Sequence, residues 1–180
     1  MIFRWQSGTG KADTEAVRKL VYLSLGSNLG DREENLREAI LRLETMGEVV
    51  KVSALYETEP VGYAAQPWFL NCAVQLETEK MPRQLLQAIR GMEQRMGRRR
   101  MRRNGPRKID IDILLFGSSV VDTAELVIPH SAMHERRFVL EPLAEIAPDA
   151  RHPVFKRTIR ELRDALPPGQ AVKRLTPSRL

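Results

Sequence analysis

The chain has 180 residues, of which 42% are hydrophobic and 29% charged, and its formal net charge is +6. This length suits one domain with a substantial core and leaves little room for a second. No apolar run approaches the ~18 residues that span a membrane, and the first residues lack the apolar stretch of a secretion signal. We therefore expect a cytoplasmic protein with no membrane partner, in which the single cysteine, Cys72, is a core thiol without a disulfide.

The first part of the chain predicts an extension, a strand and a helix. Residues 1–19 are polar and aperiodic and are interpreted as a flexible amino-terminal extension, which leaves residues 20–180 as a single domain. Residues 20–28 form an apolar run that ends in glycine, serine and asparagine, the pattern of a strand followed by a tight turn. A helix is expected from Asp31, a suitable N-cap, to Gly47, a suitable C-terminal cap.

The following segments complete a recognisable order of elements. Residues 48–58 are rich in β-branched residues and predict a strand, and residues 68–78 predict a buried strand after a loop. A second helix over residues 82–97 has proline at its start and glycine at its end. Residues 108–116 predict another strand. The order β-α-β-β-α-β predicts an α+β, ferredoxin-like fold with two helices packed on one face of the sheet, followed by short C-terminal helices, one of them over residues 158–166.

Most of the positive charge lies between the second helix and the strand that follows it. Residues 98–108 contain seven cations and no acid. A nucleic-acid-binding protein more often spreads its cations over a groove-sized face, whereas one cationic loop beside carboxylates suits a compact polyphosphate with its metal. A solvated arginine-rich loop is the other interpretation that the charge alone leaves open.

Two aspartates interrupt the apolar run that follows the arginines. Side chains alternate along a strand, so Asp110 and Asp112 share one face and lie roughly 6–7 Å apart at their Cβ atoms. Hard oxygen ligands suit Mg²⁺, and paired metal ions can clamp a phosphoryl transfer. An amphipathic strand with both aspartates in water is the alternative interpretation.

Four segments of the sequence together resemble the signature blocks of the 6-hydroxymethyl-7,8-dihydropterin pyrophosphokinase family. They are GSNLGDREENL, YETEPVGYAAQPWFLN, GRRRMRRNGPRKIDIDILLFG and VIPHSAMHERRFVLEPLAEIAP, in family order across roughly Val21 to Leu166. The resemblance implies an enzyme of folate biosynthesis. In this family the terminal diphosphate of ATP, the co-substrate, passes to the hydroxymethyl group of a reduced pterin, and AMP is released with the help of two Mg²⁺ ions.

The resemblance also assigns roles to individual residues, which we carry over as expectations. Asp110 and Asp112 are the expected metal ligands, and they form the expected catalytic group together with Arg98 and Arg107. The expected pterin-binding residues are Thr58, Glu59, Val61, Phe69, Asn71 and Phe138. The expected ATP-binding residues are Glu93, Arg98, Arg100, Arg107, Ile113, His130 and Arg136. From the residues alone, Phe69 and Phe138 are equally compatible with a core position, and His130 with a surface loop.

The sequence departs from the family pattern at two positions and leaves two rival functions open. Asn104 stands where many members carry an aromatic residue, and Glu125 stands where some relatives have a basic one. The first rival is a palm-type nucleotidyltransferase, which also carries two aspartates on a ferredoxin-like sheet. The second is a non-catalytic nucleic-acid-binding module that uses the arginine-rich loop. We expect a monomer that binds ATP and a reduced pterin and no nucleic acid.

Overall fold

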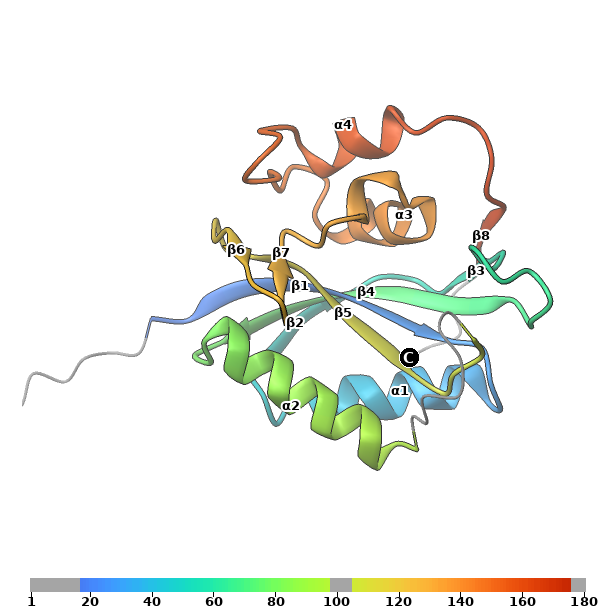
Figure 1. The fold of residues 1–180 in the computed structure, drawn as a ribbon, viewed down its shortest axis with the longest axis horizontal. Coiled ribbons are helices and arrows are strands. Elements are labelled where there is room, and N and C mark those ends of the chain that lie inside the picture. The colour runs from blue at the N-terminus through green and yellow to red at the C-terminus, as the bar shows by residue number, and fades with distance from the viewer. Residues whose placement is uncertain (1–16, 98–104, 176–180) are drawn as a thin grey trace, which may run out of the picture.

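The computed structural model of the chain describes residues 17–97 and 105–175, which are arranged around one main sheet (Figure 1). Its strands are β1 (Lys19–Ser27), β2 (Glu48–Val52), β3 (Tyr56–Thr58), β4 (Phe69–Thr78), β5 (Asp110–Phe116) and β8 (Val172–Arg174). They follow the order β5-β1-β4-β3-β8, with β2 also paired to β4, and every pairing is antiparallel.

Two helices, α1 (Arg32–Leu43) and α2 (Pro82–Arg95), cover one face of the sheet, below it in Figure 1. The predicted N-cap of α1 is confirmed, because the Asp31 carboxylate accepts the backbone N–H of Glu34 at 3.0 Å. The predicted start of α2 at its proline is confirmed as well. The helix ends at Arg95, two residues before its predicted end, and Gly97 follows the C-cap with φ +88°.

The predicted C-terminal cap of α1 at Gly47 is wrong. The helix ends at Leu43, and Glu44 is its C-cap. Gly47 is instead required by the neighbouring strand, since a Cβ at this position would lie 2.1 Å from the backbone oxygen of Glu77 in β4. Glycine therefore marks a close approach of two backbones here, and its position beyond a helix was a misleading signal.

The C-terminal part of the chain covers the opposite face of the sheet. The helices α3 (Arg137–Ile146) and α4 (Ile159–Asp164) lie above the sheet in Figure 1. A second apolar core forms between these helices and the sheet; its members include Ala73, Leu114, Leu140, Leu143 and Ile159. The predicted α+β fold with short C-terminal helices is thus confirmed, and the sheet is buried on both faces. Cys72 is fully buried, as predicted, and burial raises its thiol pKa to about 12.

The single strand predicted over residues 48–58 is wrong, because the structure divides it into β2 and β3. The division falls at Ser53, whose backbone N–H donates to the Ala73 oxygen at 2.9 Å while its hydroxyl accepts the Ala73 N–H at 2.9 Å. The hydroxyl replaces one backbone contact of the sheet and interrupts the regular strand at this point. Both strands still pair with β4, at its two ends.

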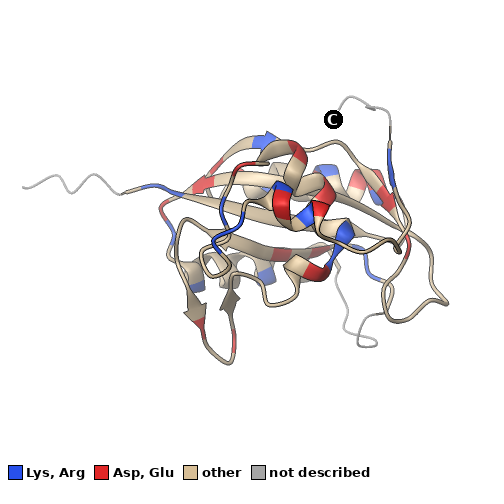
Figure 2. Ribbon diagram, turned by 90° about the horizontal axis from the view of Figure 1, so that it is seen from above, with Lys and Arg blue, Asp and Glu red and all other residues tan. Residues whose placement is uncertain are grey.

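A short hairpin of β6 (Val121–Asp122) and β7 (Val127–Ile128) lies beside β5, which is the last strand at one edge of the main sheet. Over the ranges that the structure describes, no helix has the length and apolar character needed to cross a bilayer. The ribbon in Figure 2 marks acidic and basic residues, and the two kinds are interspersed over the helices on the side of the sheet seen from above.

Candidate active site

Strand β5 presents its two aspartates on the face of the sheet opposite α1 and α2. Ile109, Ile111 and Ile113 are at most 5% exposed and pack in the core with those helices. The alternating side chains of Asp110 and Asp112 are 17% and 37% exposed and face a partly open site. The alternation predicted from the sequence is therefore present, and both carboxylates are accessible from the same side.

Cationic and titratable side chains surround the two carboxylates. Arg107 lies with its Nη2 atom 2.8 Å from Oδ2 of Asp110. The Oδ2 atom of Asp112 is 3.8 Å from His130 Nε2 and 4.0 Å from Arg136 Nη1. The Nε atom of Arg107 is buried and, among the described residues, has no hydrogen-bond partner. These positive groups reduce the repulsion between two neighbouring carboxylates, and the unsatisfied donor is suited to an acceptor of a ligand.

His130 is held in one orientation by its own backbone and ring contacts. Its backbone N–H donates to the backbone oxygen of Leu114 at 3.0 Å, and its ring Nδ1 atom accepts the backbone N–H of Ala132 at 3.2 Å. In the neutral ring the proton therefore lies on Nε2, which faces Asp112. Burial lowers the pKa of His130 below its ordinary value, although the negative charge of Asp112 acts in the opposite direction.

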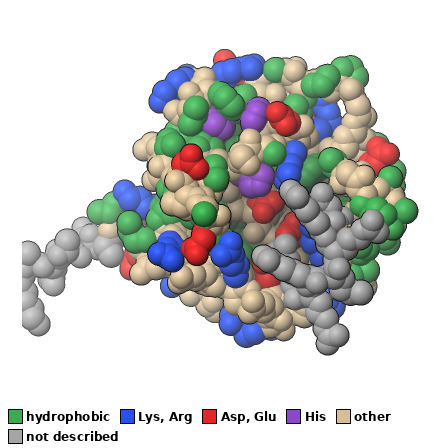
Figure 3. Space-filling model, viewed as in Figure 1, with side chains coloured by type: hydrophobic (Ala, Val, Ile, Leu, Met, Phe, Trp, Pro, Cys, Tyr) green, Lys and Arg blue, Asp and Glu red, His purple; other side chains and the backbone are tan. Residues whose placement is uncertain are grey.

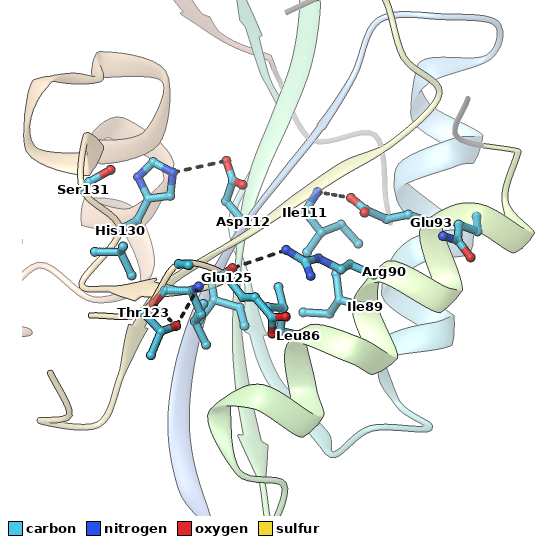
Figure 4. Close-up of a pocket in the computed structure, with 15 residues that line it drawn as sticks. Leu86, Ile89, Arg90, Glu93, Ile111, Asp112, Thr123, Glu125, His130 and Ser131 are labelled. Atoms are coloured by element: carbon cyan, nitrogen blue, oxygen red, sulfur yellow. Dashed lines mark hydrogen bonds and ion pairs between the residues drawn. The ribbon is translucent and has the colours of Figure 1, made fainter. Parts of the chain in front are cut away.

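A large cavity of about 590 Å³ opens beside this side of β5 (Figure 4). It is enclosed by α2, β5 and the β6–β7 hairpin. Its lining includes Arg90, Glu93, Asp112, Ile113 and His130. The cavity therefore brings four expected site residues, from three separate segments of the chain, around one space.

Glu93 is a buried carboxylate in the lining of this cavity, with 4% of its surface exposed. Its Oε1 atom accepts the backbone N–H of Ile111 at 2.8 Å. Figure 4 shows Glu93 reaching Ile111 from the α2 side of β5, while His130 faces Asp112 on the other side. Since Ile111 lies between the two aspartates in the chain, this hydrogen bond fixes the strand that carries them.

A smaller cavity of about 140 Å³ lies at the ends of β1, β4 and β5. Its lining includes the six expected pterin-binding residues, the two aspartates, and two of the expected arginines: Thr58, Glu59, Val61, Phe69, Asn71, Phe138, Asp110, Asp112, Arg107 and Arg136. Asp112 thus lines both cavities. Figure 3 shows histidine and acidic side chains gathered around the hollow on this side of the molecule.

The floor of the small cavity is a row of residues across three strands. Gly26 of β1 pairs with Asp110 of β5 on one side and with Asn71 of β4 on the other. A Cβ on Gly26 would lie 2.6 Å from Oδ1 of Asn71, so the glycine leaves the space that the amide occupies. The Nδ2 atom of Asn71 donates to the Thr58 hydroxyl at 2.6 Å, which fixes the orientation of the amide.

Asn28 joins the loop beside the small cavity to the backbone at Arg107. Its Nδ2 atom donates to Gln66 Oε1 and to the Pro67 oxygen, each at 3.0 Å. Its Oδ1 atom accepts the Arg107 N–H at 2.8 Å, and its own N–H donates to the Arg107 oxygen at 3.1 Å. Because only 2% of Asn28 is exposed, these contacts are protected from water and fix two walls of the site relative to each other.

Comparison with known proteins agrees with this arrangement. A family model described as 7,8-dihydro-6-hydroxymethylpterin-pyrophosphokinase (HPPK) matches residues 22–148. The chain belongs to this family. It is 48% identical over 132 residues to the 2-amino-4-hydroxy-6-hydroxymethyldihydropteridine pyrophosphokinase of Bacillus subtilis, covering 72% of this chain and 79% of that one. It is 47% identical over 150 residues to the Methylorubrum extorquens protein of the same name, covering 82% and 94%.

A solved HPPK-DHPS chain of Plasmodium falciparum has the same fold, with a TM-score of 0.69 at 20% sequence identity. The match covers 84% of this HPPK-family chain and 45% of the Plasmodium chain. This chain therefore spans less than half of that two-part protein, and the likeness supports the fold alone.

The residues of this HPPK-family chain fit a divalent cation that is bound together with a phosphate ligand. Asp110 and Asp112 offer hard oxygen donors on one face, as Mg²⁺ prefers. Within the described ranges, no group of three or more His, Cys, Asp or Glu side chains is arranged to hold a metal ion. Two carboxylates leave most of an octahedron to water and phosphate oxygens, which is the usual arrangement for Mg²⁺ with a nucleotide.

The structure brings together the expected site residues that it describes, and it adds others. Arg98, Arg100 and the departure at Asn104 lie outside the described residues. Sequence reasoning missed the contacts of Asn28, which follows the first strand and was interpreted as part of a structural turn. It also missed Gln170, which no family block includes.

Proposed function

We propose that this chain transfers the terminal diphosphate of ATP to the hydroxymethyl group of 6-hydroxymethyl-7,8-dihydropterin and releases AMP. The observation that carries this proposal is the position of Asp112, which lines both the large and the small cavity. A carboxylate at their junction lies where the phosphate chain of a nucleotide in one cavity would meet the hydroxyl of a small substrate in the other. Membership of the HPPK family supports the same assignment.

The large cavity is the proposed ATP site. His130 and Arg136 would contact the phosphate chain beside Asp112, and Arg107 would do so beside Asp110. Guanidinium groups suit phosphate oxygens because they donate two parallel hydrogen bonds and stay charged. Arg98 and Arg100 remain predicted phosphate contacts.

The small cavity is the proposed pterin site. Phe69 and Phe138 offer aromatic faces for a flat ring, and the Asn71 amide offers a donor and an acceptor for its edge. The hydrogen bond from Asn71 to Thr58 orients that amide before the substrate arrives. A ring held here would direct its hydroxymethyl group towards the aspartates that the two cavities share.

In the proposed reaction the substrate hydroxyl oxygen attacks the β-phosphorus, the bond between that phosphorus and the oxygen of AMP breaks, and the hydroxyl proton passes to solvent. Asp110 and Asp112 would hold two Mg²⁺ ions. When bound, such ions neutralise charge on the phosphate oxygens. Positioning and electrostatic stabilisation dominate phosphoryl transfer, so the hydrogen bond from the Ile111 N–H to Glu93 contributes by holding the strand that carries the two carboxylates.

We also propose that residues 20–180 act as one catalytic unit and that the protein works as a monomer in the cytoplasm. The described residues of one chain line both cavities, so one copy can form both proposed sites. The extension over residues 1–19 has no assigned role in the reaction.

The test is the release of AMP from ATP and Mg²⁺ with the reduced pterin alcohol, beside a control without pterin. The proposal expects pterin-dependent AMP in equal amount to the diphosphorylated pterin. Release of pyrophosphate would instead indicate the nucleotidyltransferase. Salt-sensitive binding of an oligonucleotide without turnover would indicate the nucleic-acid-binding module.

A further inference from the structure

Gln170 connects two walls of the small cavity, although it does not line the cavity itself. Its Nε2 atom donates to the backbone oxygen of Glu59 at 2.8 Å. Its Oε1 atom accepts the backbone N–H of Phe138 at 3.3 Å. A single amide group therefore spans from the loop after β3 to the first turn of α3.

The contact with Phe138 completes the start of α3. The first N–H groups of a helix have no partner within the helix and need an acceptor from elsewhere. Arg136 is the N-cap of α3, and its side chain makes no capping hydrogen bond. Gln170 supplies an acceptor to this first turn from a distant part of the chain, and it does so at the residue whose ring lines the cavity.

The contact with Glu59 is made from an anchored segment. Strand β8 follows Gln170 and pairs with β3, with Val172 opposite Thr58. The N–H of Glu59 also donates to the Ala171 oxygen at 3.1 Å. The segment is thus fixed to the Thr58–Glu59 backbone, and the Gln170 side chain extends this attachment to α3.

We propose that Gln170 is a positioning residue for the pterin site. It sets the separation between the Phe138 wall and the Thr58–Glu59 wall, and it acts through them without touching the substrate. This inference rests on the proposed function of the small cavity. It assigns a role to a residue outside positions 22–148, the part of the chain that the family model matches.

The physical basis is preorganisation. If the two walls separate in part of the population, the apparent affinity falls by the fraction that remains competent to bind. Gln170→Met keeps the size of the side chain but removes both hydrogen bonds. Gln170→Glu keeps an acceptor for the Phe138 N–H but faces the Glu59 oxygen with a second acceptor.

The control is Arg174→Ala, which loosens the same C-terminal segment at a point away from the cavity. Arg174 contacts Glu145 with its Nη2 atom at 3.1 Å and its Nε atom at 3.3 Å. A general weakening of β8 would appear in this variant as well. If the effect is specific to Gln170, Arg174→Ala should not show it.

The experiment measures AMP release to obtain KM for the pterin alcohol, KM for ATP and kcat, together with a thermal unfolding midpoint for each protein. Gln170→Met is expected to raise the pterin KM about tenfold, with the ATP KM and kcat within about twofold of wild type. Gln170→Glu is expected to raise the pterin KM by less. Arg174→Ala is expected to leave it unchanged.

Three results would overturn the inference: a pterin KM within about twofold of wild type in Gln170→Met, an equal rise in Arg174→Ala, or an equal rise in the ATP KM. If Gln170→Met does not fold, Gln170→Glu decides alone, and a wild-type pterin KM in that variant overturns the inference. Failure of the proposed function is separate, because the wild-type protein itself would then release no pterin-dependent AMP.

Discussion

The two cavities that meet at Asp112 differ in how they are built. The large one, about 590 Å³, is walled mainly by helix α2, strand β5 and a hairpin. The small one, about 140 Å³, is walled by strand ends, a loop and the first turn of a helix. Regular elements keep their positions through apolar packing, whereas irregular segments depend on individual side-chain hydrogen bonds. The small cavity is therefore expected to be the more sensitive to single substitutions.

Specific contacts support this contrast. On the large side, Leu86 and Ile89 of α2 pack against the main core, and many apolar neighbours share the task of holding the helix. On the small side, the single side chain of Asn28 connects the loop at Gln66 and Pro67 to the backbone at Arg107. The loss of one apolar side chain of α2 leaves its neighbours to hold the helix, whereas the loss of the Asn28 side chain removes all of these hydrogen bonds at once.

The largest effect is expected at the junction of the cavities. Asp112→Ala removes the carboxylate that lines both and should lower kcat about a thousandfold, the order of an electrostatic stabilising group in the transition state. Folding should be unaffected, because the side chain is partly exposed and lies near His130 and Arg136 without a close hydrogen bond. Steady-state AMP release and a thermal melt test both statements.

Asp122→Ala is the matched control for this substitution. Asp122 is an exposed aspartate in β6 and lines neither cavity. Its loss should leave turnover at the wild-type level. Near-normal turnover in Asp112→Ala would show that the carboxylate between the two cavities is not needed for the reaction. The two cavities would then have no shared catalytic group.

The second largest effect is expected at Asn28. Asn28→Ala removes three side-chain hydrogen bonds in a buried position, which should cost about 2–3 kcal/mol of unfolding free energy. Misplacement of Arg107 and the loop should lower kcat/KM for the pterin about a hundredfold. Urea unfolding and AMP release measure the two quantities.

Asn28→Asp separates the two connections that Asn28 makes. The carboxylate still accepts the Arg107 N–H but no longer donates to Gln66 or Pro67, so an intermediate loss is expected. If Asn28→Ala raised the KM for ATP and the KM for the pterin by the same factor, the hydrogen bonds of Asn28 would serve both cavities. The proposed difference in sensitivity would then be wrong.

Sequence reasoning captured what depends on local pattern. The order of the elements, the Asp31 cap and the alternation of Asp110 with its isoleucine neighbours all follow from periodicity and capping chemistry. The break at Ser53 could not be predicted this way, because a β-branched run gives no sign that a hydroxyl will replace a backbone contact.

The contacts that hold the small cavity could not be predicted from pattern either. Asn28 and Arg107 are 79 positions apart, and Gln170 and Glu59 are 111 apart. Such pairs have no periodic signature, and each amide is equally compatible with a solvated turn. The family blocks identified residues that line the site, while the residues that hold those walls required the structure.

A moderate effect is expected from filling the floor of the small cavity. Gly26→Ala would put a Cβ 2.6 Å from Oδ1 of Asn71, so the amide must move away from its place beside Thr58. The pterin KM should rise about tenfold, with little loss of stability because the displaced group is the end of a side chain. AMP release at saturating ATP measures the change.

Gly91→Ala is the control for adding a methyl group. Among the described residues, a Cβ at Gly91 in α2 would meet the end of the Arg95 side chain, at 3.3 Å. The pterin KM should stay at the wild-type value, and the helix should gain slightly in stability, since alanine is the better helix former. If the pterin KM of Gly26→Ala were unchanged as well, the Asn71 amide could move without loss of pterin binding. The small cavity would then be less sensitive to single substitutions than expected.

The smallest effect is expected on the wall of the large cavity, where Arg90 and Arg83 form a matched pair. Both extend from α2 to Glu125: Arg90 donates to its backbone oxygen at 3.3 Å, and Arg83 lies 3.5 Å from its carboxylate. Only Arg90 lines the cavity. Since Arg90 is exposed, its charge is screened by water, and Arg90→Ala should raise the ATP KM only about threefold. The pterin KM should not change, and Arg83→Ala should change neither. A tenfold or larger rise in the ATP KM of Arg90→Ala would contradict the comparison. Packing of α2 alone would then be insufficient to form the ATP site, and single side chains would matter as much in the large cavity as in the small one.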